Sequence, residues 1–173
     1  MAKHVTLIGM MGAGKSSVAP LLAKHLGRQV IEVDELIEKQ EGMPIGEIFI
    51  AKGEAYFRRV EGAVITELIK QPAAVLSLGG GAFMWEATRD LLLRDTVVIY
   101  LGARLETLES RLRTSAATRP LLNVPGSDLS AIIQDLVGRR GPIYGLAHHR
   151  VETDSRTPDE VAREIVKLRG TYD

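Results

Sequence analysis

The sequence predicts an α/β protein, a three-layer α/β/α sandwich in which helices cover both faces of a parallel sheet. Short runs rich in Val, Ile and Leu recur along the chain, and stretches with the apolar spacing of helices lie between them. The length of 173 residues predicts one domain, spanning 1–173. With 45% hydrophobic and 25% charged residues, the composition is typical of globular proteins.

Five strands are expected from the short apolar runs, which are bounded by turn residues. They are 5–9, 29–34, 73–78, 96–101 and about 149–154. The helix after the first strand is expected to begin near Lys15. Another begins near Gly53, because apolar residues then recur every three or four positions: Phe57, Val60, Val64 and Leu68.

The last two helices are expected from their starting residues. Ser127 is a candidate N-cap for a helix whose apolar residues continue to Leu136. The final helix is expected from Thr157 and Pro158 to about Leu168, because proline is favoured in a first turn. The segment 114–126 carries two prolines and fits no helix or strand pattern, so we expect a lid over a site.

The charge balance and the lack of cysteine exclude several classes of function. The 22 basic residues match the 22 acidic ones, whereas nucleic-acid or anionic-membrane partners usually call for a basic surplus. The absence of cysteine excludes a disulfide scaffold, cysteine-ligated zinc, an iron–sulfur centre and a thiol nucleophile. We therefore expect an untargeted cytoplasmic protein, monomeric, with no nucleic-acid or membrane partner.

Residues 9–16 read GMMGAGKS, a GxxxxGK[ST] phosphate-binding loop of the P-loop NTPase type. It follows an apolar strand and precedes a helix, which is the context that the motif requires. Glycines let backbone N–H groups approach phosphate, and the helix start adds its positive dipole end. Lys15 is expected to reach the β- and γ-phosphates, and the Ser16 hydroxyl to ligate Mg²⁺. The expected ATP-binding residues here are Gly12, Ala13, Gly14, Lys15, Ser16 and Ser17.

Among P-loop proteins, the sequence favours a small-molecule kinase. A common GTPase reads guanine with an NKxD motif, but the chain's only asparagine is Asn123, in the sequence NVPG. A helicase or transporter subunit normally needs a longer chain. A small kinase needs a phosphate loop, an acceptor pocket and an arginine-bearing lid, and Arg119 lies in the proposed lid.

Acceptor-binding candidates come from other segments. Glu32 and Asp34 are expected to share one face at the end of the second strand, where they could hold Mg²⁺ or accept from a hydroxyl. The glycines 79–81 follow the third strand and permit close approach of a ligand. Arg58 and Glu61 lie one turn apart on a helix, a spacing more often found in surface ion pairs. Arg140 is expected to face the apolar side of its helix and so to need an anion.

Taken together, these residues resemble the shikimate kinase family over nearly the whole chain. The resemblance rests on the order and spacing of the segments 9–16, 32–34, 53–61, 78–81, 118–122 and 140–144. It implies a sheet of order 2-3-1-4-5 and transfer of the γ-phosphoryl group of ATP to the 3-hydroxyl of shikimate. That reaction belongs to the route to chorismate and the aromatic amino acids.

The resemblance also implies roles for individual residues. Asp34 would bind the acceptor hydroxyls and act as base, with an acceptor-binding region at about 34–61. Lys15 and Arg119 would contact the phosphates, and Ser77 would lie near Mg²⁺. The remaining implied roles are shikimate binding by Arg58, Gly79, Gly80, Gly81 and Arg140, and adenine binding by Arg113 and Arg156. In place of Glu32 the family usually has aspartate, and the longer side chain moves its carboxylate.

Two alternatives remain open at this point. A gluconate-type sugar-acid kinase on the same scaffold would also present a carboxylate and hydroxyls. A non-catalytic ATP-binding module would keep the P-loop but would not need the set of Arg58, Arg119 and Arg140.

Overall fold

The computed structural model describes residues 2–113, 128–168 and 170. The proposed lid at 114–126, with Arg119, and the candidate N-cap Ser127 lie outside this part of the chain. Within it, no helix is both long and apolar enough to cross a membrane.

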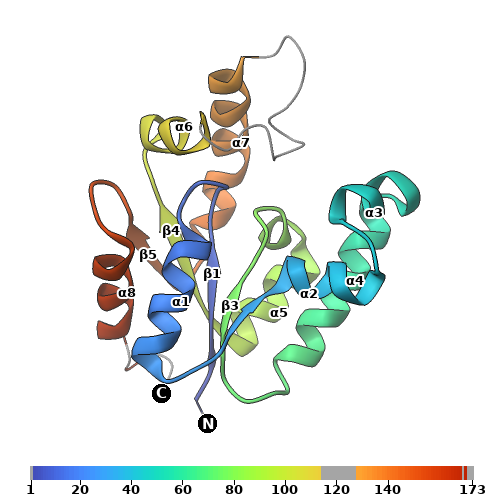
Figure 1. Cartoon of the computed structure of the whole chain (residues 1–173), viewed down its shortest axis with the longest axis horizontal. Helices are drawn as coiled ribbons and strands as arrows, with labels where there is room; N and C mark the ends of the chain where they lie inside the picture. The colour runs from blue at the N-terminus through green and yellow to red at the C-terminus, as the bar shows by residue number, and fades with distance from the viewer. Residues whose placement is uncertain (1, 114–127, 169, 171–173) are drawn as a thin grey trace.

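Five strands form one parallel sheet in the order β2-β3-β1-β4-β5, which confirms the predicted fold (Figure 1). The strands are β1 (His4–Ile8), β2 (Val30–Glu32), β3 (Val75–Ser77), β4 (Thr96–Gly102) and β5 (His149–Glu152). Every residue of β1, β3 and β4 is buried. The continuous apolar runs follow from this, because a parallel sheet is covered on both faces.

Helices lie on both faces of this sheet and at one side of it. In Figure 1, α1 and α8 pack together in front of the strands, whereas α5 and α7 lie behind them. The helical segments are α1 (Lys15–Leu26), α2 (Val33–Glu41), α3 (Ile45–Lys52), α4 (Glu54–Leu68), the short 3₁₀ turn η1 (Ala82–Met84), α5 (Glu86–Asp95), α6 (Leu105–Arg113), α7 (Leu129–Tyr144) and α8 (Pro158–Lys167).

The second strand is shorter than the sequence prediction, which was wrong about Asp34. β2 ends at Glu32, and Asp34 lies in the first turn of α2. Acidic residues in that turn suit the positive end of the helix dipole. Val33 and Ile37 are four positions apart, so the helix places both on its buried face. Glu32 and Asp34 therefore do not share a strand face, although both line the same cleft.

The starts of the last two helices show how their caps work. Asp128, not Ser127, is the N-cap of α7, and its side chain accepts a hydrogen bond from the Ser130 backbone N–H. Thr157 caps α8 as expected, in a capping box in which the Glu160 carboxylate accepts from the Thr157 backbone N–H at 2.7 Å.

The strand register brings the carboxyl ends of three strands together. Ser77, the last residue of β3, pairs with Leu7 of β1 on one side and with Glu32 of β2 on the other. Residues that follow these strands therefore meet at one edge of the sheet. In sheets of this kind, ligands bind at that edge.

Candidate active site

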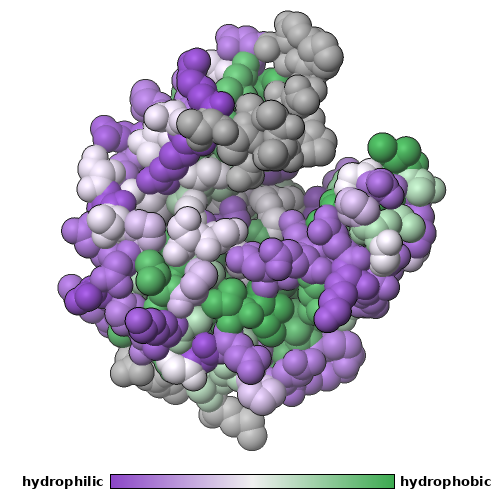
Figure 2. Space-filling model, in the orientation of Figure 1, coloured by the Kyte–Doolittle hydropathy of each residue, from purple (hydrophilic) through white to green (hydrophobic). Residues whose placement is uncertain are grey.

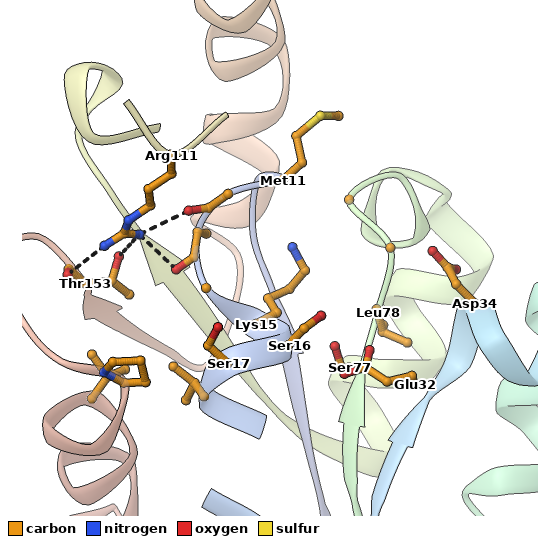
Figure 3. Close-up of a pocket in the computed structure, with 18 of the residues that line it drawn as sticks. Met11, Lys15, Ser16, Ser17, Glu32, Asp34, Ser77, Leu78, Arg111 and Thr153 are labelled. Atoms are coloured by element: carbon orange, nitrogen blue, oxygen red, sulfur yellow. Dashed lines mark hydrogen bonds between the residues drawn. The ribbon is translucent and has the colours of Figure 1, made fainter. Parts of the chain in front are cut away.

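A cleft of about 790 Å³ opens at this edge of the sheet. It is lined by the β1–α1 loop, the ends of β2 and β3, α6, the loop after β5 and the start of α8. Figure 3 shows Lys15, Ser16 and Ser17 in its centre, with Asp34, Glu32 and Ser77 on one side and Arg111 on the other. On the molecular surface, a hollow separates the α3 region from the rest of this face (Figure 2).

The β1–α1 loop needs its glycines for conformation and for space. Gly9 has φ of 147°, and a Cβ there would lie 2.6 Å from the Leu101 carbonyl oxygen. Gly14 has φ of 100° and is the N-cap of α1. Side chains rarely adopt such φ values, so the loop can form a concave phosphate-binding turn only with glycine.

Lys15 begins α1 and turns back over this loop. Its Nζ donates hydrogen bonds to the Gly9 carbonyl at 2.8 Å and to the Met10 carbonyl at 3.0 Å. The ammonium group is therefore held inside the curve of the loop, beside the start of α1. This is where the phosphates of a nucleotide would meet a positive charge and the helix dipole together.

Arg111 of α6 lies in the cleft, although it was not among the nucleotide-binding residues expected from the sequence. Its Nη1 donates to the Gly12 carbonyl at 3.1 Å and to Thr153 Oγ1 at 3.0 Å, and its Nη2 donates to the Thr153 carbonyl at 3.2 Å (Figure 3). Thr153 is buried, and its own hydroxyl donates to the Gly102 carbonyl. The guanidinium therefore joins the phosphate loop to the ends of β4 and β5.

Arg113, the predicted nucleotide residue on α6, is exposed and is not part of the cleft lining. Residues two positions apart in an α-helix are separated by about 200° around its axis, so Arg111 and Arg113 point in nearly opposite directions. The positions of the buried residues Leu108 and Leu112 indicate that Arg111 faces the protein, because they fix which side of α6 is packed. Arg156, the other predicted residue, does line the cleft.

The oxygen atoms around Ser16 fit a magnesium ion shared with a phosphate. The Ser16 hydroxyl, the Glu32 carboxylate and the Ser77 hydroxyl line the cleft together, and Glu32 and Ser77 are paired in the sheet. No group of three or more His, Asp or Glu side chains in the described part of the chain is arranged to enclose a metal. Mg²⁺ suits such a site, because it prefers oxygen, retains waters and is held largely by substrate phosphates.

The glycines after β3 pack directly against three charged side chains from three different helices. A Cβ on Gly79 would lie 2.7 Å from Asp34 Oδ2 of α2, and a Cβ on Gly80 would lie 2.7 Å from Arg140 Nη1 of α7. A Cβ on Gly81 would collide with the Arg58 guanidinium of α4. The triplet therefore brings Asp34, Arg140 and Arg58 together, where any side chain would displace one of them.

Arg58 and Glu61 form a buried ion pair and not the surface pair that their spacing suggested. Arg58 is 9% exposed and Glu61 is 1% exposed, and Arg58 Nη1 donates to Glu61 Oε2 at 2.7 Å. Burial raises the Glu61 pKa, and the charge of Arg58 opposes this. The spacing alone misled because it carries no information on burial, which the neighbouring core residues Phe57 and Ile65 impose on this side of α4.

Asp34 combines burial with a position at the cleft. Its Oδ1 is buried and accepts no hydrogen bond within the described part of the chain. Burial raises the Asp34 pKa, while the positive charges of Arg58 and Lys15 oppose the rise. An oxygen in this state is suited to accept a hydrogen bond, or a proton, from a hydroxyl group in the cleft.

The cleft therefore has a phosphate-binding centre and the Asp34 carboxylate, while the guanidinium groups of Arg58 and Arg140 pack against the glycine turn and are not part of the cleft lining. A family model described as shikimate kinase matches residues 11–169. The chain belongs to the shikimate kinase family. It is 38% identical to the shikimate kinase of Thermodesulfovibrio yellowstonii, over 95% of this chain and 94% of that protein. It is 41% identical to the shikimate kinase of Zymomonas mobilis, over 95% of this chain and 92% of that protein.

Solved shikimate kinases also share the whole fold. The enzyme from Acinetobacter baumannii, in complex with shikimate, matches with a TM-score of 0.89 at 34% identity, covering 99% of this chain and 94% of that one. A gluconokinase from Sinorhizobium meliloti matches with a TM-score of 0.65 at 18% identity, which shows a common fold alone.

Proposed function

We propose that this protein transfers the γ-phosphoryl group of ATP to the 3-hydroxyl of shikimate, giving shikimate 3-phosphate and ADP. Membership of the shikimate kinase family supports this activity. The observation that carries the assignment of residues is the packing of Gly79, Gly80 and Gly81 against Asp34, Arg140 and Arg58. This packing supports the assignment because it offers positive charge for one carboxylate and an acceptor oxygen for hydroxyls next to a phosphate loop.

On the nucleotide side, the backbone N–H groups of the loop bind the phosphates. Lys15 exchanges its bonds to the Gly9 and Met10 carbonyls for the β- and γ-phosphate oxygens. Arg111 and Arg156 bind the nucleotide at the other end of the cleft, where both line the wall. Arg119 approaches the transferring group from the segment 114–126.

On the acceptor side, Arg58 and Arg140 bind the shikimate carboxylate. Two guanidinium groups suit one carboxylate because each can donate paired, charge-assisted hydrogen bonds. The buried Glu61 holds the Arg58 side chain in place through its 2.7 Å hydrogen bond. Little side-chain freedom then remains to be lost when shikimate binds.

Asp34 accepts the hydrogen bond of the 3-hydroxyl and takes its proton during transfer. The hydroxyl oxygen forms a bond to the γ-phosphorus as the bond from that phosphorus to the β–γ bridging oxygen breaks, and ADP leaves. Mg²⁺, held by Ser16 with Glu32 and Ser77 nearby, would neutralise charge on the phosphates. Lys15 and the helix dipole of α1 stabilise the same charge from the protein side.

We further propose that the chain is a single kinase domain that acts as a monomer in the cytoplasm, without nucleic-acid or membrane partners. The zero net charge supports the lack of nucleic-acid and membrane partners, since it provides no general attraction to anionic surfaces.

A parallel ATP-consumption assay tests the proposed reaction. Purified protein is given ATP and Mg²⁺ with shikimate, gluconate, AMP or no acceptor, and ADP release is followed. We expect turnover with shikimate alone and loss of turnover when EDTA removes Mg²⁺. Turnover only with gluconate or AMP would overturn the substrate assignment, and ADP release independent of any acceptor would overturn the kinase assignment.

A further inference from the structure

Tyr144, the last residue of α7, joins that helix to the glycine turn after β3. The side chain is fully buried, and its hydroxyl donates a hydrogen bond to the Gly80 carbonyl at 2.6 Å. Its ring packs on that of Tyr100 in β4, with ring centroids 5.1 Å apart and the ring planes at 30°. The ring therefore holds α7 against the sheet, while the hydroxyl reaches the site.

Arg140 and Tyr144 converge on the same glycine. They lie four residues apart on α7, so their side chains share one face of the helix. A Cβ on Gly80 would lie 2.7 Å from Arg140 Nη1 and 3.3 Å from the Tyr144 hydroxyl oxygen. Arg140 thus packs against the α-carbon of Gly80 while Tyr144 bonds to its carbonyl, and the two contacts fix the turn relative to α7.

The Tyr144 hydroxyl is a permanent donor. Burial raises the pKa of Tyr144 to about 12, although the neighbouring positive charge of Arg140 opposes the rise. The phenol therefore remains protonated throughout the pH range in which a kinase is assayed, and the Gly80 carbonyl keeps its partner. Without the hydroxyl, that carbonyl would lose this hydrogen bond, and backbone polar groups in such places are rarely left unpaired.

The effect of this bond extends beyond Gly80. The flanking glycines, Gly79 and Gly81, pack against Asp34 and Arg58 with no intervening side chain. A shift of the turn therefore moves the surface on which both of these side chains rest. The turn approaches the phosphate loop at Gly80, where a Cβ would lie 3.6 Å from the Gly9 carbonyl oxygen, an ordinary contact distance. The side chains that hold the loop, Lys15 and Arg111, bond to its carbonyls and not to this turn.

We propose that Tyr144 is a positioning residue for the acceptor, acting through Gly80 and Arg140 to set the distance between the two guanidinium groups that bind the shikimate carboxylate. The proposal rests on the proposed function, because it assigns that carboxylate to Arg58 and Arg140. It predicts an effect on the acceptor and not on ATP.

The test is Tyr144→Phe, which removes one hydroxyl and keeps the ring and its packing. We expect the KM for shikimate to rise about tenfold, equivalent to about 1.4 kcal/mol, with the KM for ATP changed by less than about twofold. Tyr100→Phe is the matched control, because it removes the hydroxyl of the stacked ring without touching Gly80. It is expected to leave both KM values unchanged. An unchanged shikimate KM in Tyr144→Phe, or equal rises for both substrates, would overturn the proposal.

Hydrogen–deuterium exchange of the substrate-free protein provides a second readout, which does not depend on turnover. Peptides covering residues 79–85 should exchange faster in Tyr144→Phe than in the wild-type protein or in Tyr100→Phe. Equal exchange in all three proteins would contradict the positioning role. If Tyr144→Phe shows the faster exchange but the wild-type protein does not phosphorylate shikimate, the error lies in the proposed function and not in the positioning role.

Discussion

Replacing Gly81 with alanine tests the acceptor site by a steric change alone, because it adds one uncharged methyl group beside Arg58. Gly81 has φ of −91° and ψ of −16°, a right-handed conformation that alanine adopts readily, so the backbone should tolerate the change. The added methyl group would lie 3.0 Å from Arg58 Cζ and 3.3 Å from Nη1. Arg58 Nη2 would be closer still and would overlap the methyl group. Unstrained contacts of this kind need roughly 3.5–4 Å, so the guanidinium must retreat by more than about 1 Å.

That retreat disturbs the binding of a carboxylate. Loss of one charge-assisted hydrogen bond costs about 1.5–3 kcal/mol, so we expect the KM for shikimate to rise roughly 10- to 100-fold. The KM for ATP should stay the same, because the three atoms nearest to a Cβ on Gly81 all belong to Arg58 and none to the phosphate loop. Coupled measurement of ADP release, with each substrate varied at saturation of the other, separates the two effects.

Gly138→Ala is the matched control for this experiment. Gly138 lies inside α7, and a Cβ there would have no heavy atom within 4 Å. It should leave both KM values unchanged. A folded Gly81→Ala protein with an unchanged shikimate KM would refute the placement of Arg58 at the acceptor carboxylate.

Three further predictions concern the phosphate loop, the buried carboxylate and a helix cap. Lys15→Met should lower kcat at least about 100-fold without lowering the Tm, and retained activity would remove Lys15 from the mechanism. Asp34→Asn should abolish transfer and raise the Tm at neutral pH. Because burial raises the Asp34 pKa, the folded protein binds this proton more tightly than the unfolded chain, and stability is lost as pH rises through the folded pKa. If the Tm of Asp34→Asn is still above that of the wild-type protein at pH values below the pKa of an unfolded aspartate, that explanation is wrong. Thr157→Ala removes the cap of α8 and should cost about 1 kcal/mol, lowering the Tm by about 2–4 °C in a thermal melt.

The fold and the phosphate loop were predictable because their signals are local. A strand, GxxxxGKS and a helix are consecutive in the sequence, and the apolar runs reflect the burial of β1, β3 and β4. The family resemblance then supplied the strand order, which local patterns do not contain. The family also matched Arg58 and Arg140 to one substrate group, although they are far apart in the chain.

The errors arose where two structures compete for the same residues or where burial decides. The residues around Asp34 suit both the end of a strand and the acidic first turn of a helix, and packing of Val33 and Ile37 selects the helix. Arg111 was missed in favour of Arg113 because the direction of α6 around its own axis depends on what Leu108 and Leu112 pack against. Neither outcome follows from spacing without knowledge of the neighbouring elements.

The strand order also divides the enzyme's work between two sides of β1. β2 and β3, with Asp34 and the glycine turn, lie on one side, and β4 and β5, with Thr153 beside Arg111, lie on the other. The phosphate loop follows the central strand and serves both. Variation on the β2–β3 side could therefore change which alcohol is phosphorylated while the nucleotide side is left intact. α7 is the exception, because Arg140 and Tyr144 reach from it to Gly80, so a new acceptor would require changes there as well.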